Sequence, residues 1–249
     1  LCIKDLYMKN LLISIAFAIS LFTHYAYSMS QHDELKQVEE VLMTILHDNA
    51  DFSRRHNHQY FEKFAKTQHP RATVITCADS RVHDQALEQS PDNDLFIVRN
   101  IGNQIYTAEG SVEYGVHHLH TPLLLIIGHS ACGAIISAGG DYSKESEHIK
   151  RELSTIKLNR NINTKDEQQV IEGVKDNINH QVKFALKKFA RDVSSRKLTV
   201  IGAVYDFTNI MHHGEGKLTI TNVNGNSDPA YVKKTLDQMK LYPHIKNHH

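Results

Sequence analysis

Short apolar, β-branched runs that alternate with helix-like segments are the feature that most constrains the fold of this chain. Runs with the character of buried strands lie at residues 72–77, 95–98, 123–127, 198–204 and, in a shorter form, 218–221. Amphipathic segments lie between most of them, at about 109–119, 131–139, 146–158 and 166–191, and a last one at about 229–240. This alternation predicts an α/β fold, a single domain with a mostly parallel central sheet flanked by helices.

Two further helices are expected ahead of the first strand. Ser30 to Asp33 resemble a capping box that opens a helix through about His47, and a second helix is expected at about 57–67. The first of these helices carries an apolar face made of Leu35, Val38, Leu42, Ile45 and Leu46. Because no repeat or linker divides the chain, we expect residues 29–249 to form one domain.

Residues 1–28 are expected to lie outside the fold. Met8 precedes the apolar run Leu11–Phe22, and the small residues Ala26 and Ser28 lie before a cleavage point. The pattern predicts upstream residues followed by a secretory signal peptide. An uncleaved anchor is the alternative, but the run is shorter than the roughly 20 residues that span a bilayer. We therefore expect an exported, periplasmic protein with no stable membrane insertion after cleavage.

The charge balance limits the partners. The 249-residue chain has 28 Lys and Arg and 28 Asp and Glu, and no basic stripe or acidic tail breaks this balance. Nucleic acid is therefore not an expected partner, and a small neutral or singly charged substrate is easier to accommodate.

Three residues with metal-binding chemistry follow two of the predicted strands. Cys77 ends the first run, and His129 and Cys132 follow the third. Because sites form outside the carboxyl ends of parallel strands, these side chains are able to converge. Two thiolates and an imidazole favour zinc, and three protein ligands leave the open position of a catalytic site. A disulfide between Cys77 and Cys132, or buried free cysteines beside a satisfied histidine, stay open as alternatives.

The sequence around these residues resembles a known family. CADSRV at 77–82 and GHSACG at 128–133 resemble the two signature motifs of the β-class carbonic anhydrases. Further similar segments, in the expected order, are VRNIGN at 98–103, SVEY at 111–114 and, more weakly, GAVYD at 202–206. The resemblance is strongest over residues 60–135, and together with the signal-peptide pattern it implies an exported bacterial member of this class.

The resemblance implies roles for the two motifs. Cys77, His129 and Cys132 match the ligands of one Zn²⁺ per subunit, and Asp79 and Arg81 match a catalytic Asp–Arg pair. The arginine fork suits a carboxylate, which then stays ionised and accepts a hydrogen bond from zinc-bound hydroxide. In some family members the same aspartate binds the metal as a fourth ligand and closes the site. The sequence leaves open which state applies to Asp79.

The implied activity is the zinc-dependent, reversible hydration of carbon dioxide to bicarbonate and a proton. In this class, zinc-bound hydroxide attacks CO2 in an apolar pocket, which a neighbouring subunit often completes. The positions that match substrate-binding residues are Gln68, Phe96, Ile101, Tyr114 and Gly133. A homodimer or homotetramer is implied, in which the N-terminal helices pack on a neighbouring subunit.

Several alternatives and departures remain at this point. A relative on the same scaffold that hydrolyses carbon disulfide, a non-catalytic zinc module closed by Asp79, and a thiol redox protein are the rival functions. Some family members have an inhibitory bicarbonate site that uses a Trp, whereas this chain has none and carries Phe52 in the comparable stretch. We expect the other histidines to be solvated or packed, because no spacing selects a proton shuttle among His117, His118, His120, His212 and His213.

Overall fold

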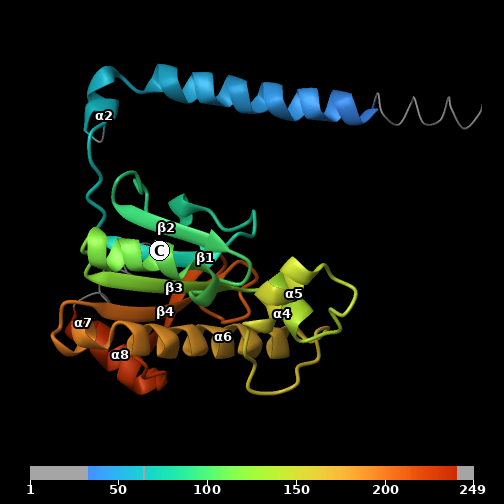
Figure 1. Ribbon diagram of the computed structural model, residues 1–249, viewed down its shortest axis with the longest axis vertical. Coiled ribbons are helices and arrows are strands. Elements are labelled where there is room, and N and C mark those ends of the chain that lie inside the picture. Colours follow the sequence, from blue (N-terminus) through green and yellow to red (C-terminus); the bar gives the residue numbers. More distant parts are fainter. Residues whose placement is uncertain (1–32, 64, 240–249) are drawn as a thin grey trace, which may run out of the picture. The chain divides into compact units, whose positions relative to one another are not determined.

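The computed structural model describes residues 33–63 and 65–239 (Figure 1). The chain divides into two compact units, one ending at Lys66 and the other beginning at Thr67. The predicted signal peptide at 1–28 lies outside the described residues, as does the predicted end of the last helix at Lys240. Among the described residues, no helix combines the length and the apolar character that crossing a membrane requires.

The described part of the first unit, residues 33–63 and 65–66, contains two helices. One covers residues 33–55, past its predicted end at His47, and α2 (His58–Glu62) follows after the cap residue Asn57. Helix α2 is shorter than the predicted 57–67, and it buries no residue that would stabilise a longer helix by packing. The apolar face of the first helix is 51% to 68% exposed at Leu35, Val38, Leu42, Ile45 and Leu46. Its packing on a neighbouring subunit stays a prediction.

The second unit contains a five-stranded sheet of order β2-β1-β3-β4-β5. Its strands are β1 (Ala72–Cys77), β2 (Leu95–Asn100), β3 (Leu123–His129), β4 (Thr199–Asp206) and β5 (Lys217–Val223). Strands β2, β1, β3 and β4 are parallel, and β5 pairs antiparallel to β4. The prediction of a mostly parallel sheet is confirmed.

The helices of this unit lie where the amphipathic segments predicted them, but some are interrupted. They are α3 (Glu109–Glu113), α4 (Gly133–Ala138), α5 (Glu147–Ser154), α6 (Glu167–Lys188), α7 (Ala190–Ser194) and α8 (Pro229–Gln238). The predicted helix at 109–119 continues after α3 as a π-helical turn, η3 (Tyr114–His118), and the one at 166–191 breaks at the buried Phe189. Two 3-10 turns, η1 (Asp84–Ala86) and η2 (Tyr106–Ala108), were not predicted, because so short a turn has no hydrophobic period.

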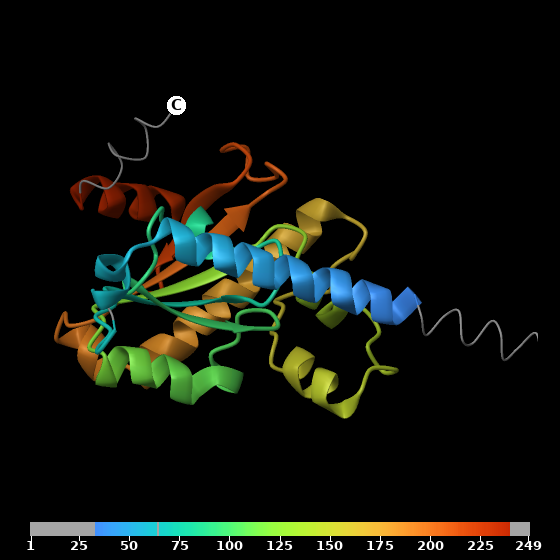
Figure 2. The same ribbon diagram turned by 90° about the horizontal axis from the view of Figure 1, so that it is seen from above.

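Helices cover both faces of the sheet, as predicted (Figure 2). Helix α6 packs on β3 and β4, and α8 packs on β5. Successive residues of β4 point to opposite faces, so that Val200 joins the core under α6 and Ile201 joins the core under α8. Gly128 allows α6 a close approach beside the end of β3, since a Cβ there would lie 2.7 Å from Val174 Cγ1.

The strand order places a topological switch point at the carboxyl ends of β1 and β3. Strand β1 has β2 on one side and β3 on the other, so the chain leaves β1 in one direction and returns on its opposite side. Strands β1 and β3 are in register, with Thr76 opposite Ile127, and their carboxyl ends therefore lie level. Parallel sheets bind ligands at such a topological switch point.

Candidate metal centre

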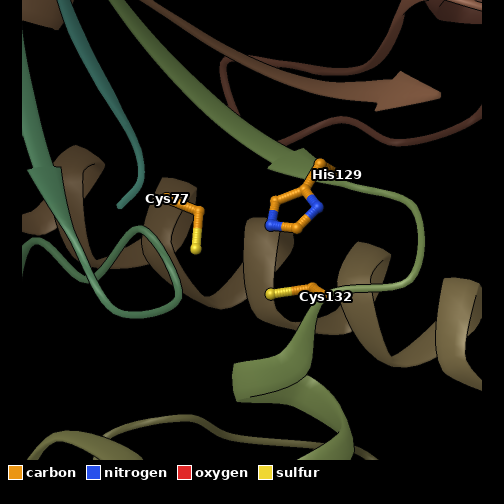
Figure 3. A group of neighbouring side chains, drawn as sticks. All are labelled: Cys77, His129 and Cys132. Atoms are coloured by element: carbon orange, nitrogen blue, oxygen red, sulfur yellow. The ribbon is translucent and has the colours of Figure 1, made fainter. Parts of the chain in front are cut away.

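Cys77, His129 and Cys132 converge at this switch point (Figure 3). One ligand atom of each residue lies within 4.8 Å of the others, and all three residues are buried. Cys77 is the last residue of β1, His129 is the last residue of β3, and Cys132 caps α4. Both cysteines are free, so the described structure holds a dithiol and an imidazole and not the alternative disulfide.

The histidine ring is oriented for metal binding by its own chain. Nδ1 of His129 lies 2.9 Å from the carbonyl oxygen of Ser130. A carbonyl only accepts, so Nδ1 donates, and Nε2 faces the cysteines with a free lone pair. This Nε2 is buried and has no hydrogen-bond partner. A buried polar atom without a partner is unfavourable by about 1–3 kcal/mol, which a metal ion would relieve. The donor set Cys2His fits zinc with one position left open.

The turn between His129 and Cys132 explains how both side chains reach the same space. Ala131 has φ of +52°, a left-handed conformation that residues with a side chain rarely adopt. Its carbonyl accepts a hydrogen bond of 3.1 Å from Nη2 of Arg81. The strained turn is therefore tied to the loop that follows β1.

The two thiols have opposite acidities in the metal-free protein. A hydrogen bond from Cys132 lowers the pKa of Cys77, against the opposing effect of burial, and the nearby His129 side chain and the N–H of Gly102 lower it further. The hydrogen bond to Cys77 and burial raise the pKa of Cys132. Cys77 is therefore the first thiolate. Metal binding has to remove the remaining proton, so zinc affinity should rise with pH.

Asp79 and Arg81 form a pair beside the cluster. Nε and Nη2 of Arg81 donate to the two carboxylate oxygens at 2.9 and 2.7 Å, and its backbone N–H donates to Oδ1 at 3.0 Å. These bonds hold the pKa of Asp79 well below its usual range, chiefly through the Arg81 side chain. Oδ2 of Asp79 lies 3.8 Å from Nε2 of His129. An ionised carboxylate therefore lies next to the metal position.

Of the five residues that match the substrate pocket, the structure brings two into contact with each other. The rings of Phe96 on β2 and Tyr114 in η3 are 5.8 Å apart between centroids, and Tyr114 is 43% exposed. Ile101 is 40% exposed, and nothing lies within 4 Å of a Cβ built on Gly133. Gln68 is exposed ahead of β1. The structure brings Phe96 and Tyr114 together, and the substrate roles of all five residues stay predictions.

A family model described as carbonic anhydrase matches residues 72–217, which include the whole cluster and the Asp79–Arg81 pair. The chain belongs to the carbonic anhydrase family. The carbonic anhydrase of Synechococcus elongatus is 44% identical over 82 residues, which cover 30% of this chain and 30% of that protein. Carbonic anhydrase 2 of Mycobacterium tuberculosis is 41% identical over 75 residues, covering 30% of this chain and 36% of that protein. The matched region thus spans about a third of the length of these relatives.

Solved structures place the fold in the β-class. A β-carbonic anhydrase of Sordaria macrospora, described as tetrameric, superposes with a TM-score of 0.60 at 22% identity, covering 74% of this chain and 96% of that chain. The Coccomyxa β-carbonic anhydrase in complex with acetazolamide gives a TM-score of 0.60 at 22% identity, covering 82% of this chain and 96% of that one. The predicted resemblance to β-class carbonic anhydrases is confirmed.

Arg99 supports the loop of this β-class site and was missed in the sequence. Its guanidinium donates to the carbonyl oxygens of Cys77 at 3.2 Å and Asp79 at 2.9 Å, and also to that of Val82. It therefore fixes the backbone that carries the Asp79–Arg81 pair. Arg99 lies in a segment that resembles the family, but its sequence spacing does not predict hydrogen bonds to carbonyls of β1 and of the loop that follows it.

A buried amide network supports the other side of Cys77 and was also missed. Gln104, Asn177 and Gln181 are each at most 2% exposed. Nδ2 of Asn177 donates to the carbonyl of Gly102 at 2.9 Å, and Gln181 bonds Gln104 at 2.9 Å. Gly102 has φ of +74° and directs its N–H at Cys77. The only sequence signal is a pair of amides four residues apart on the buried face of α6.

Proposed function

We propose that the protein catalyses the zinc-dependent, reversible hydration of carbon dioxide to bicarbonate and a proton. The observation that carries this proposal is the buried, unpaired Nε2 of His129, which faces two free cysteines beside an arginine-held carboxylate. Membership of the carbonic anhydrase family supports the same activity. Carbon dioxide and bicarbonate are a small neutral and a singly charged molecule, the kind of substrate that the balanced charge of the chain accommodates easily.

Cys77, His129 and Cys132 would hold one Zn²⁺ per chain. When bound, zinc lowers the pKa of a water molecule towards about 7 and so supplies a hydroxide nucleophile at neutral pH. The hydrogen bond to Cys77 and burial raise the pKa of Cys132 on balance, but the N–H groups of Ile135 and Ala134 point at its sulfur and oppose that rise, which favours the thiolate that a metal needs.

Asp79 would orient the nucleophile. Its carboxylate is held ionised by Arg81, so it accepts hydrogen bonds and donates none. Beside His129, it would accept a hydrogen bond from the attacking oxygen and so turn the lone pair of that oxygen towards the substrate. Arg81 holds both carboxylate oxygens, and it thereby opposes movement of Asp79 onto the metal.

The substrate would lie against apolar side chains. Phe96 and Tyr114 offer a pair of aromatic rings that is partly open to solvent. Carbon dioxide has no charge and weak hydrogen-bonding capacity, which suits such a surface. We assign Ile101, Gly133 and Gln68 to the same pocket because they match the family positions, with Gln68 as the polar member.

We also propose a homodimer or homotetramer and export to the periplasm. The apolar face of helix 33–55 is exposed within its own unit, and burial against a second copy would remove it from water. The described tetramer of the Sordaria macrospora relative supports the same assembly. Export rests on the signal-peptide pattern of residues 1–28.

Stopped-flow hydration of CO2 tests the activity. The protein loaded with one equivalent of zinc should hydrate CO2, and the metal-free protein should not. Carbon disulfide, offered to the same preparation, should be hydrolysed poorly. No turnover of CO2 together with turnover of carbon disulfide would replace the proposal with the rival activity. No turnover of either substrate would favour a non-catalytic zinc protein.

A further inference from the structure

Phe207 contacts the arginine of the Asp79–Arg81 pair. The guanidinium carbon of Arg81 lies 4.9 Å from the centroid of the Phe207 ring, in a cation–π arrangement. The hydrogen bonds of Arg81 to Asp79 and Ala131 all lie at the edge of the guanidinium. The Arg81 side chain is 51% exposed, so these edge bonds alone leave its plane free to tilt. The guanidinium lies over the Phe207 ring, which is a further contact that restrains it.

The position of Phe207 is fixed by the loop that carries a metal ligand. Its backbone N–H donates to Oγ of Ser130 at 2.9 Å, and Ser130 directly follows His129. Its ring lies 5.3 Å from the His129 ring and meets Tyr205 edge to face at 5.2 Å. Phe207 is therefore a bridge between the metal ligand His129 and the guanidinium of Arg81.

Asp206 fixes the same segment from the other side. It is fully buried and accepts hydrogen bonds from the backbone N–H groups of Thr208 at 3.0 Å and Met211 at 2.8 Å. The chain is thus anchored immediately before and after Phe207. The ring is held in place by the fold, and does not depend on Arg81 for its position.

We infer that Phe207 is a positioning residue, which fixes the guanidinium plane of Arg81 and thereby keeps the Asp79 carboxylate beside the metal position and not on it. The inference rests on the proposed zinc site. Oδ2 of Asp79 lies 3.8 Å from Nε2 of His129, so the carboxylate is close to the metal position. A tilt of the Arg81 guanidinium would move the carboxylate that it holds towards or away from that position. Loss of a partly exposed cation–π contact should shift this balance by about two- to fivefold.

Azide binding to the Co²⁺-substituted full chain measures this balance without using CO2 hydration. The visible spectrum of Co²⁺ reports whether azide or a protein ligand holds the fourth position. Phe207→Leu removes the aromatic face and keeps an apolar side chain, so Asp79 should compete more often and the azide dissociation constant should rise about two- to fivefold. Phe207→Tyr keeps the aromatic face and should retain the azide affinity of the unmodified protein. Phe207→Met replaces Phe207→Leu if the latter does not load with Co²⁺.

The same substitution in an Arg81→Ala background separates this inference from a general packing effect. If Phe207 acts through Arg81, Phe207→Leu should change azide binding no further in that background. An unchanged azide affinity in Phe207→Leu would overturn the inference, as would a change of the same size with and without Arg81. A chain that shows this coupling but hydrates no CO2 would contradict the proposed function and leave the inference standing.

Discussion

Asp79 and His129 approach each other across two strands, with Oδ2 of the carboxylate 3.8 Å from Nε2 of the imidazole. Asp79 follows β1 and His129 ends β3, so their distance is set by the register of the sheet and by the two turns beyond it. Arg81 takes both carboxylate oxygens at the same time. The site therefore places one aspartate between an arginine and a metal position, and its activity should depend on which of the two holds Asp79.

Arg81→Ala should lower CO2 hydration roughly tenfold to a hundredfold at neutral pH, because the charge-assisted hydrogen bonds that hold Asp79 are worth about 1.5–3 kcal/mol. Stopped-flow rates at equal zinc content check this. Arg71→Ala is the matched control, since Arg71 also clamps a carboxylate, Asp94, but outside the cluster. Equal rates for Arg81→Ala and Arg71→Ala would mean that the Asp79 clamp has no role in the reaction.

Asn177→Leu should destabilise the protein and weaken its hold on zinc. The change removes one of the two donors to the Gly102 carbonyl and one of the two acceptors of Nε2 of Gln104, and the two lost buried hydrogen bonds are together worth about 1–3 kcal/mol. Urea unfolding of the metal-free protein measures the first effect, and competition with a chelator measures the second. Lys183→Ala, at an exposed position of the same helix, should change neither. Normal zinc affinity in a destabilised Asn177→Leu would show that the network does not act on the metal site.

Asp206→Asn should reduce stability most at neutral pH and less in acid. Burial raises the pKa of Asp206, but hydrogen bonds from Met211, Thr208 and their neighbours outweigh it, and the folded pKa lies below the usual value. A depressed carboxyl pKa gives stability above the unfolded value of about 3.9, which is lost as pH falls through the folded pKa. The difference in unfolding free energy should be about 1–3 kcal/mol at pH 7 and should shrink below pH 4. A difference that stays constant from pH 7 to pH 3 would contradict this origin. Glu215→Gln, an exposed neighbour, serves as control.

Leu42→Glu with Ile45→Glu should reduce the size of the assembly. Both side chains are more than half exposed on the helix at 33–55, where burial against a second copy would favour association. Sedimentation velocity should show a smaller species for the double variant. Glu40 lies about 140° round the helix from Leu35 at a period of 3.6 residues per turn. The control variant Glu40→Gln should therefore sediment like the unmodified protein. An unchanged assembly in the double variant would remove this face from the interface.

The sequence predicted the strands and the position of the cluster because both depend on local patterns. Runs such as 72–77 and 123–127 are apolar and β-branched, and parallel strands bring their carboxyl ends to one edge whatever the intervening chain does. The extents of α3 and α2 were less predictable, because the sequence period suggests longer helices. A π-helical turn takes over where α3 ends, and α2 buries no residue that would stabilise a longer helix.

The supporting residues of the site escaped prediction for a different reason. Asn177 reaches Gly102 and Phe207 reaches Arg81 from remote parts of the chain, and each contact exists only once the sheet has formed. An amide on a helix or a phenylalanine after a strand has no local feature that distinguishes support of a metal site from ordinary packing. Such contacts are set by tertiary geometry.

The most direct test of the central claim is CO2 hydration measured as zinc is titrated into the metal-free protein. Cys77, His129 and Cys132 form the one such cluster among residues 33–63 and 65–239, so the rate should rise linearly and level off at about one zinc per chain. His129→Ala should neither bind zinc tightly nor hydrate CO2 at any ratio. A protein that binds one zinc through these residues but shows no hydration would contradict the proposed function, and hydration that is independent of zinc would contradict the proposed site.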